Sequence, residues 1–399
     1  MLINYADKAV VGLSSVQIMQ ELNLSHAQFG MLGSAFFLLF SASGVAVGFL
    51  ANRCSSKTLM GVMGVIWAAA LLPMSMVSSF AVLLGSRVVL GAAEGPAFPV
   101  AVHAVYKWFG DRHRALPTSV VASGAAFGAG IIAPLITWII VHHGWHAAFG
   151  ALGAAGLAWA CLWGVFAEEG PGAGSAGSAA ARAVPYRQLV LSRTALGVYL
   201  AGFAAYWVIA LNLVWLANYL IKAVHMSPGD AAWVIALPSI MQMVLAPAIA
   251  YLSQRLSESG LSSRISRGAL GTSCVMVCGI SMACLPWVAM GALKIFLLGL
   301  SFSIGSVIFT LGSTLIGEIA PASQRGAMLG IANSIHTLAG LCAPVAMGLV
   351  VDINADPAAG FRTGYLYAGI LVAALGAAAA LLIDPEHDLA RFRALRGSE

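Results

Sequence analysis

Residues 27–51 read AQFGMLGSAFFLLFSASGVAVGFLA, and none of these side chains carries a charge. A helix that crosses the hydrocarbon core of a bilayer needs about 20 consecutive, mainly apolar residues. Residues 58–86 form a second uncharged run of sufficient length. These runs predict an integral membrane protein whose main structural unit is the transmembrane helix.

The composition supports a lipid environment. Hydrophobic residues make up 60% of the chain and charged residues 9%, whereas about a quarter of the residues of a soluble protein are charged. The net charge of +5 is spread over many predicted loops, so no basic patch indicates nucleic-acid binding. The six cysteines lie in or beside apolar runs without metal-ligand spacing. We therefore expect the lipid bilayer as a partner, no nucleic acid, no metal and no cofactor.

Hydropathy predicts eleven complete spans, near residues 27–51, 58–78, 80–106, 115–141, 146–166, 195–221, 231–253, 268–289, 295–317, 327–351 and 364–383. Ahead of them, residues 1–20 are similar to the second half of one further helix. The prediction is an all-α polytopic protein of twelve transmembrane helices, the first of them truncated. We expect the native reading frame to start upstream by about 20 residues, the length that a complete span requires.

The spans fall into two groups. Residues 168–194 are rich in Gly, Ala and Ser and contain two prolines, as is typical of a linker. The predicted parts are an N-terminal six-helix half (1–167), the linker (168–194), a C-terminal six-helix half (195–384) and a tail (385–399). Residues 48–53 resemble 250–255, and residues 129–134 resemble 339–344 at nearly the same offset. This repeat indicates a duplicated unit, an architecture found in transporters.

Most of the twenty Lys and Arg residues fall in alternate loops on one side. Because cytoplasmic loops retain basic residues, the linker and the tail are predicted to be cytoplasmic, in a multi-pass protein of the cell membrane. Lys8 and Arg87 do not fit this pattern, since both lie inside spans.

Four ionisable residues lie inside spans of the N-terminal half: Asp7, Lys8, Arg87 and Glu94. A charge at the bilayer centre costs at least ~2.5 kcal/mol, so such groups are expected to face a cavity or a partner. Arg87 and Glu94 are two helical turns apart and share one face, about 10 Å apart along the axis. We predict that Asp7 and Glu94 carry protons and that Lys8 and Arg87 hold an anion. A purely structural ion-pair cluster is the alternative.

The motifs of the chain resemble one family. They are Asn4-Tyr5-Ala6-Asp7-Lys8, Arg87-Val-Val-Leu-Gly-Ala-Ala-Glu94-Gly-Pro-Ala-Phe-Pro99, Trp108-Phe109 and Gly144-Trp145-His146. Together they are similar to the anion:cation symporter branch of the major facilitator superfamily, over nearly the whole chain. The resemblance implies a major facilitator fold and transport of an organic anion, commonly with protons. It also implies that Asp7 and Glu94 couple protons, while Arg87 faces the anion. Tyr5 and Lys8 are further candidates for substrate contact.

The family's loop motif after the second span is altered here. It corresponds to Gly48 through Arg53, with Asn52 in place of an acid, followed by Lys57. Arg255 ends the matching segment of the second half. The resemblance implies a role for these residues in gating, weakened by the loss of the acid at Asn52.

Other departures concern the substrate. The family usually has Arg where this chain has Lys8, and polar side chains where Phe40 and Ala125 align. Apolar side chains at these two positions favour a less hydroxylated carboxylate, aromatic or short and aliphatic. In the C-terminal half, Asn333, His336 and Trp215 are further candidates for substrate contact, although packing is the alternative for each of them.

The predicted function is proton-coupled uptake of a small organic anion by alternating access, in a monomer. An exporter of lipophilic compounds and a substrate sensor that does not transport are the alternatives. An enzyme is not expected, because the sequence contains no GxSxG or HExxH pattern.

Overall fold

The computed structural model describes residues 1–50, 54–108, 120–121, 124, 128, 132–170, 184–321 and 324–397. Every regular element in these ranges is a helix. Ten of the described helical stretches are long and apolar enough to cross a membrane. The prediction of an all-α polytopic membrane protein is therefore confirmed.

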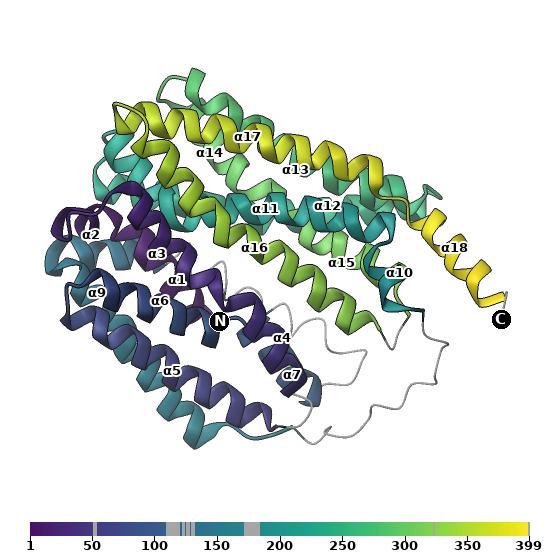
Figure 1. Cartoon of the computed structure of the whole chain (residues 1–399), viewed down its shortest axis with the longest axis horizontal. Helices are drawn as coiled ribbons and strands as arrows, with labels where there is room; N and C mark the ends of the chain where they lie inside the picture. Colours follow the sequence, from purple (N-terminus) through teal and green to yellow (C-terminus); the bar gives the residue numbers. More distant parts are fainter. Residues whose placement is uncertain are drawn as a thin grey trace. The chain divides into compact units, whose positions relative to one another are not determined.

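The first part of the chain forms helices α1 to α9 as labelled in Figure 1. Their bounds are α1 Leu2–Leu13, α2 Ser15–Glu21, α3 His26–Leu38, α4 Phe40–Leu50, α5 Ser56–Met76, α6 Phe80–Glu94, α7 Ala97–Trp108 and α9 Ile132–Phe166. The remaining helices are α10 Tyr186–Val190, α11 Arg193–Asn218, α12 Pro228–Glu258, α13 Leu270–Cys284, α14 Ala292–Ser303, α15 Val307–Ile319, α16 Arg325–Asp352, α17 Pro357–Leu382 and α18 Pro385–Gly397. Short π and 3-10 segments lie at Tyr219–Ala223, Arg264–Ala269, Leu285–Trp287 and Ile304–Ser306.

The chain forms two compact units. The first unit contains residues 1–176 together with 210–239 and 340–361, and the second contains 177–209, 240–339 and 362–399. Residues 210–218 of α11, 228–239 of α12 and 340–352 of α16 thus belong to the first unit, although the sequence places these helices in the C-terminal half.

Two backbone breaks shape the helices of the first unit. Gly144 lies inside α9 with a φ of 81°, a left-handed conformation that glycine adopts without a steric penalty. It divides this long helix into two helical segments. The second break is at Gly95 and Pro96, where the chain leaves α6 before α7 begins. Helices α1 and α2 lie ahead of the first of the ten candidate spans in the described part of the chain.

Close helix contacts hold the first unit together. A β-carbon at Gly91 of α6 would lie 1.7 Å from the backbone oxygen of Phe36 in α3, so only glycine allows these two helices to pack in this way. Helices α5 and α9 lie side by side (Figure 1), and the Trp67 and Trp159 rings stack between them with centroids 5.9 Å apart.

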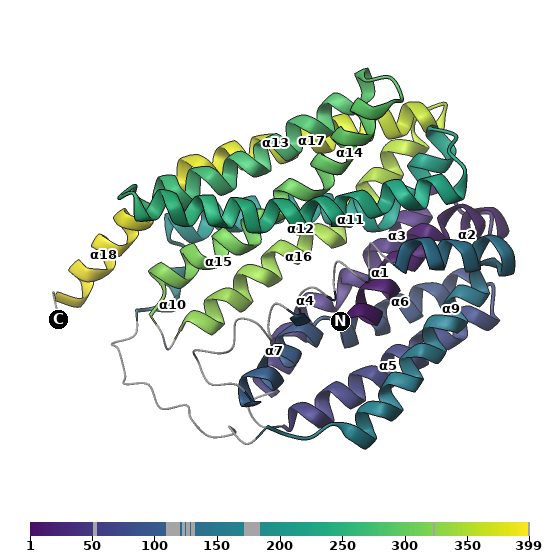
Figure 2. The same cartoon turned by 180° about the vertical axis from the view of Figure 1, so that it is seen from behind.

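The second unit uses the same kind of contact. A β-carbon at Gly279 of α13 would lie 2.4 Å from the backbone nitrogen of Ala373 in α17, and these two helices run beside each other in Figure 2. Its core also includes Tyr199, Leu315 and Phe392, which are buried. Helix α18 therefore packs onto this unit through an apolar side chain.

Candidate functional site

Helices α1 and α6 bring the four ionisable residues of the N-terminal spans together. The exposed fractions are 0% for Asp7, 7% for Lys8, 3% for Arg87 and 1% for Glu94. Lys8 Nζ lies 3.4 Å from Glu94 Oε2, so the two side chains form a buried ion pair. We call these four residues the charged cluster. Their proximity fits the prediction that they face partners inside the protein.

Hydrogen bonds orient the two cations. Lys8 Nζ donates to Asn4 Oδ1 at 2.9 Å, one helical turn earlier. Arg87 donates from one terminal nitrogen to the backbone oxygen of Asp7 at 3.4 Å. Arg87 thus contacts Asp7 through the main chain, and the carboxylate of Asp7 does not take part in this hydrogen bond.

Several buried polar atoms of the charged cluster and of the neighbouring Asn4 have no hydrogen-bond partner among the described residues. They are both carboxylate oxygens of Asp7, both carboxylate oxygens of Glu94, Nε of Arg87 and Nδ2 of Asn4. The 3.4 Å contact between Lys8 and Glu94 is therefore an ion pair without hydrogen-bond geometry. Buried polar atoms without a partner are costly. In this site, the carboxylate oxygens can therefore accept a proton, and the nitrogen atoms can donate a hydrogen bond to an anionic ligand.

Aromatic rings surround the two cations. Lys8 Nζ lies 4.3 Å from the ring centroid of Tyr5 and 5.1 Å from that of Phe40. The guanidinium carbon of Arg87 lies 4.4 Å from the ring centroid of Phe36. Cation–π contacts of this kind stabilise a desolvated charge. They also place apolar ring surface beside the groups that are predicted to bind the anion.

The candidates from the C-terminal half lie in other surroundings. Trp215 of α11 is fully buried, and its Nε1 donates to the backbone oxygen of Pro344 at 2.9 Å. His336 of α16 belongs to the second unit, where its ring lies 5.7 Å from that of Phe309. Asn333, one turn earlier, is exposed. The structure does not place Trp215 among the contacts of the charged cluster.

The predicted gating loop is described in part. Gly48 lies in α4, whereas Asn52 and Arg53, like Ala125, lie outside the described residues. Lys57 lies in the first turn of α5 and is partly exposed. Arg255, near the end of α12, donates from Nε to the hydroxyl of Tyr251 at 2.7 Å.

Glu169 caps the helix that follows this loop. Its carboxylate accepts a hydrogen bond from Ser55 Oγ at 2.6 Å, and two more from the backbone nitrogens of Ser56 and Lys57 at 3.2 and 3.0 Å. A carboxylate is favourable at a helix N-terminus. The first residues of the predicted linker are therefore fixed to α5.

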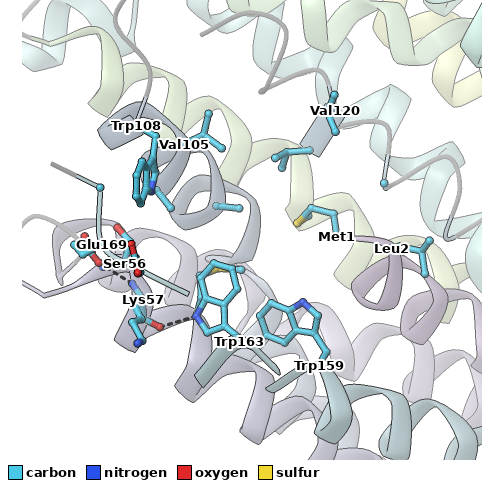
Figure 3. A pocket seen from close by; sticks show the side chains of 17 residues that line it. Met1, Leu2, Ser56, Lys57, Val105, Trp108, Val120, Trp159, Trp163 and Glu169 are labelled. Atoms are coloured by element: carbon cyan, nitrogen blue, oxygen red, sulfur yellow. Dashed lines mark hydrogen bonds between the residues drawn. The ribbon is translucent and has the colours of Figure 1, made fainter. Parts of the chain in front are cut away.

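A cavity of about 430 Å³ lies near this cap, inside the first unit. Its lining includes Trp108, Trp159 and Trp163, with Lys57 at one edge. Figure 3 shows these side chains and the 2.9 Å hydrogen bond from Trp163 Nε1 to the backbone oxygen of Lys57. None of the four residues of the charged cluster lines this cavity.

The motif Gly144-Trp145-His146 is part of a polar clamp. The carboxylate of Glu21 accepts hydrogen bonds from Ser78 Oγ and from Trp145 Nε1, the latter at 2.6 Å. His146 Nε2 lies 3.8 Å from the same carboxylate. The clamp joins the ends of three helical segments at the predicted outer end of the first unit.

Asn4 and Phe36 also belong to the site, although neither was predicted from the sequence to have a role there. Asn4 is fully buried and bonds Lys8, and its spacing of four from Lys8 places both on one helix face. Phe36 lies four residues before Phe40 on the same uncharged run, so the same helical spacing predicts a shared aromatic face.

Curated relatives match nearly the whole chain. The chain is similar to a probable sulfoacetate transporter of Cupriavidus necator, with 27% identity over 96% of this chain and 91% of the relative. It is also similar to a probable galactarate/D-glucarate transporter of Bacillus subtilis, with 24% identity over 96% of this chain and 89% of the relative. A D-galactonate transporter of Escherichia coli is 25% identical over 95% of this chain and 92% of the relative.

Solved structures show the same fold. A bacterial homologue of the human lysosomal transporter Spinster superposes with a TM-score of 0.79, at 15% identity, over 98% of this chain and 95% of that structure. A D-xylose–proton symporter superposes with a TM-score of 0.74, at 14% identity, over 97% and 96%. The Major Facilitator Superfamily model matches residues 1–304 and 198–398. The chain therefore belongs to the Major Facilitator Superfamily of membrane transporters, and its homologues include sugar-acid and organic-anion transporters.

Proposed function

We propose that this transporter takes up a small organic anion together with protons by alternating access. The observation that supports the proposal best is the charged cluster, in which two cations and two carboxylates are buried and the carboxylate oxygens have no hydrogen-bond partner. Ionisable groups inside a membrane protein commonly mark substrate and proton pathways. The two halves of the chain, residues 1–167 and 195–384, are the parts that would rock around the site.

The contact between Lys8 and Glu94 provides a coupling mechanism. When Glu94 is ionised, its carboxylate forms an ion pair with the ammonium group of Lys8, at a distance of 3.4 Å. A proton on Glu94 removes this competition, so Lys8 becomes available to a substrate carboxylate. Asp7 acts beside it, since its carboxylate has no hydrogen-bond partner. The proton and the anion therefore favour each other's binding, which is what symport requires.

The surroundings of the cations favour a weakly hydroxylated substrate. Phe36 and Phe40 present ring faces beside Arg87 and Lys8, and a ring face offers no strong hydrogen bond to a sugar hydroxyl. The relatives include transporters named for sulfoacetate as well as for sugar acids. We propose a short or aromatic carboxylate, or a sulfonate of similar size, held by Lys8 and Arg87 and packed on Tyr5 and Phe40.

Ala125, Trp215, Asn333 and His336 contribute to the walls of the substrate path. The loop from Gly48 to Lys57 and the region of Arg255 take part in gating on the cytoplasmic side. The linker and the C-terminus face the cytoplasm, and the protein works as a monomer.

Uptake into proteoliposomes tests the proposal. Radiolabelled sulfoacetate, benzoate, galactonate and galactarate are offered with and without an inward proton gradient. The wild type is expected to accumulate at least one anion, and the gradient to increase the accumulation. Glu94→Gln is expected to lose gradient-driven accumulation but to keep exchange of preloaded anion, because the neutral side chain cannot release a proton.

Glu168→Gln is the matched control, because Glu168 is exposed and lies outside the candidate spans. It is expected to behave as the wild type. Absence of anion uptake under every gradient would refute the proposal. Uptake that does not depend on the gradient would retain anion transport and refute proton coupling.

A further inference from the structure

Asp352, the last residue of α16, binds the beginning of α3. Its Oδ1 accepts a hydrogen bond from the backbone nitrogen of His26 at 2.9 Å, and its Oδ2 accepts one from the backbone nitrogen of Ala27 at 2.7 Å. The side chain of His26 adds a contact of 2.8 Å between Nδ1 and Oδ1. All these residues belong to the first unit, although Asp352 comes from the predicted C-terminal half.

Asp352 supplies what the local cap of α3 lacks. The first N–H groups of a helix have no partner inside the helix. Ser25 accepts the N–H of Gln28 in a capping box, so the N–H groups of His26 and Ala27 remain. The carboxylate of Asp352 takes both of them, and its negative charge is favourable at this end of the helix.

Glycines bring the backbones of α3 and α16 into contact below this cap. A β-carbon at Gly348 would lie 2.3 Å from the backbone oxygen of His26, and one at Gly30 would lie 2.5 Å from that of Pro344. In α11, Val214 is buried against Gly33 of α3. The predicted N-terminal and C-terminal halves thus meet at their outer ends through small residues and one carboxylate.

We propose that Asp352, His26 and Ala27 form an outer latch, which holds α3 against α16 and opens once in every transport cycle. This inference rests on the proposed alternating-access function, because only such a cycle requires the two halves to separate at this end. The side chains of His26 and Asp352 are 22% and 26% exposed. Water can therefore replace the released hydrogen bonds, so opening is reversible.

Labelling of a buried position tests the latch without any substrate. Val214→Cys, in a background without the six native cysteines, is treated with an impermeant maleimide from the outer side of oriented vesicles. In Asp352→Ala, the labelling rate is expected to rise about fivefold, which corresponds to the loss of one helix cap of about 1 kcal/mol. In Asp352→Asn, one acceptor oxygen remains, so a smaller rise is expected.

Asp356→Ala is the matched control. Asp356 lies in the same connection, and its carboxylate accepts the local N–H of Ala359 at 3.2 Å, so its loss is expected to leave the labelling of Val214→Cys unchanged. Hydrogen exchange provides a second measurement in the protein with its native cysteines. The amides of His26 and Ala27 are expected to exchange faster in Asp352→Ala and at the wild-type rate in Asp356→Ala.

Unchanged labelling and unchanged amide exchange in Asp352→Ala would overturn the latch. An equal effect of Asp356→Ala would overturn it as well, since the response would then be a general loosening of the connection. Faster labelling in a protein that takes up none of the tested anions would support the latch and refute the proposed function, so the two failures are distinguishable.

Discussion

At the scale of single residues, Lys8 supplies the positive charge that compensates the buried carboxylate of Glu94. Its ammonium group is the buried ion-pair partner of Glu94. Removal of one partner of a buried ion pair leaves an uncompensated charge and costs about 3–5 kcal/mol. Lys8→Met is therefore expected to lower thermal stability by this order in detergent, measured by intrinsic tryptophan fluorescence, and to abolish anion uptake.

A second change tests this explanation. Glu94→Gln in the Lys8→Met background removes the unpaired carboxylate, so most of the lost stability is expected to return while uptake stays absent. Lys57→Met removes the same type of side chain from a partly exposed position and is expected to change stability little. If Lys8→Met lowers stability by the same amount in the wild type and in the Glu94→Gln variant, the ion-pair explanation is contradicted.

The sequence predicted which residues form the charged cluster better than it predicted their contacts. Asp7, Lys8, Arg87 and Glu94 are recognisable because a charge inside an apolar run is expensive. Spacing fixes relations only within one helix, so the pairing of Lys8 with Glu94 across two helices needed the structure. Asp352 lies at the end of a span, where a carboxylate is common. The sequence therefore does not indicate that Asp352 contacts α3.

At the scale of helices, the contact between α3 and α6 holds the charged cluster in register. A β-carbon at Gly91 would lie 1.7 Å from the backbone oxygen of Phe36. Gly91→Ala is expected to push the two helices apart, at a cost of about 1–3 kcal/mol for overpacking, and to reduce uptake because Phe36 and Arg87 move relative to each other. Thermal unfolding and the uptake assay measure the two effects.

Gly85 on the same helix supplies the control. A β-carbon there would meet no atom within 4 Å, so Gly85→Ala is expected to be neutral, or to stabilise by up to about 1 kcal/mol through helix propensity. Equal loss of stability in both variants would show that any added methyl group destabilises α6, whether or not it lies close to α3.

Hydropathy predicted most helices, since runs such as 58–78 and 195–221 correspond to α5 (Ser56–Met76) and α11 (Arg193–Asn218) within a few residues. It did not predict where backbones bend. The predicted span 80–106 is divided into α6 and α7 at Gly95 and Pro96. The division of α9 at Gly144 depends on a backbone angle that apolar content does not specify.

At the scale of the whole molecule, the internal repeat predicted two halves but could not predict which parts of them touch. The first unit combines residues 1–176 with residues 210–239 and 340–361. Contacts between positions more than 300 residues apart, such as Asp352 with His26, depend on which side of each helix faces its neighbour. A nearly uniform apolar surface gives no signal for that choice.

The glycine contact between α3 and α16 leads to a prediction about the coupling of the two halves. Gly348→Ala inserts a methyl group against the backbone oxygen of His26, so it is expected to loosen the outer latch and to speed labelling of Val214→Cys. Gly330→Ala on the same helix meets no atom within 4 Å and is expected to leave the labelling unchanged.

The effects of two substitutions that act on the same contact are not additive. Gly348→Ala is therefore expected to add little to Asp352→Ala, and fully additive effects on the labelling rate would show that the glycine and the carboxylate act on separate contacts.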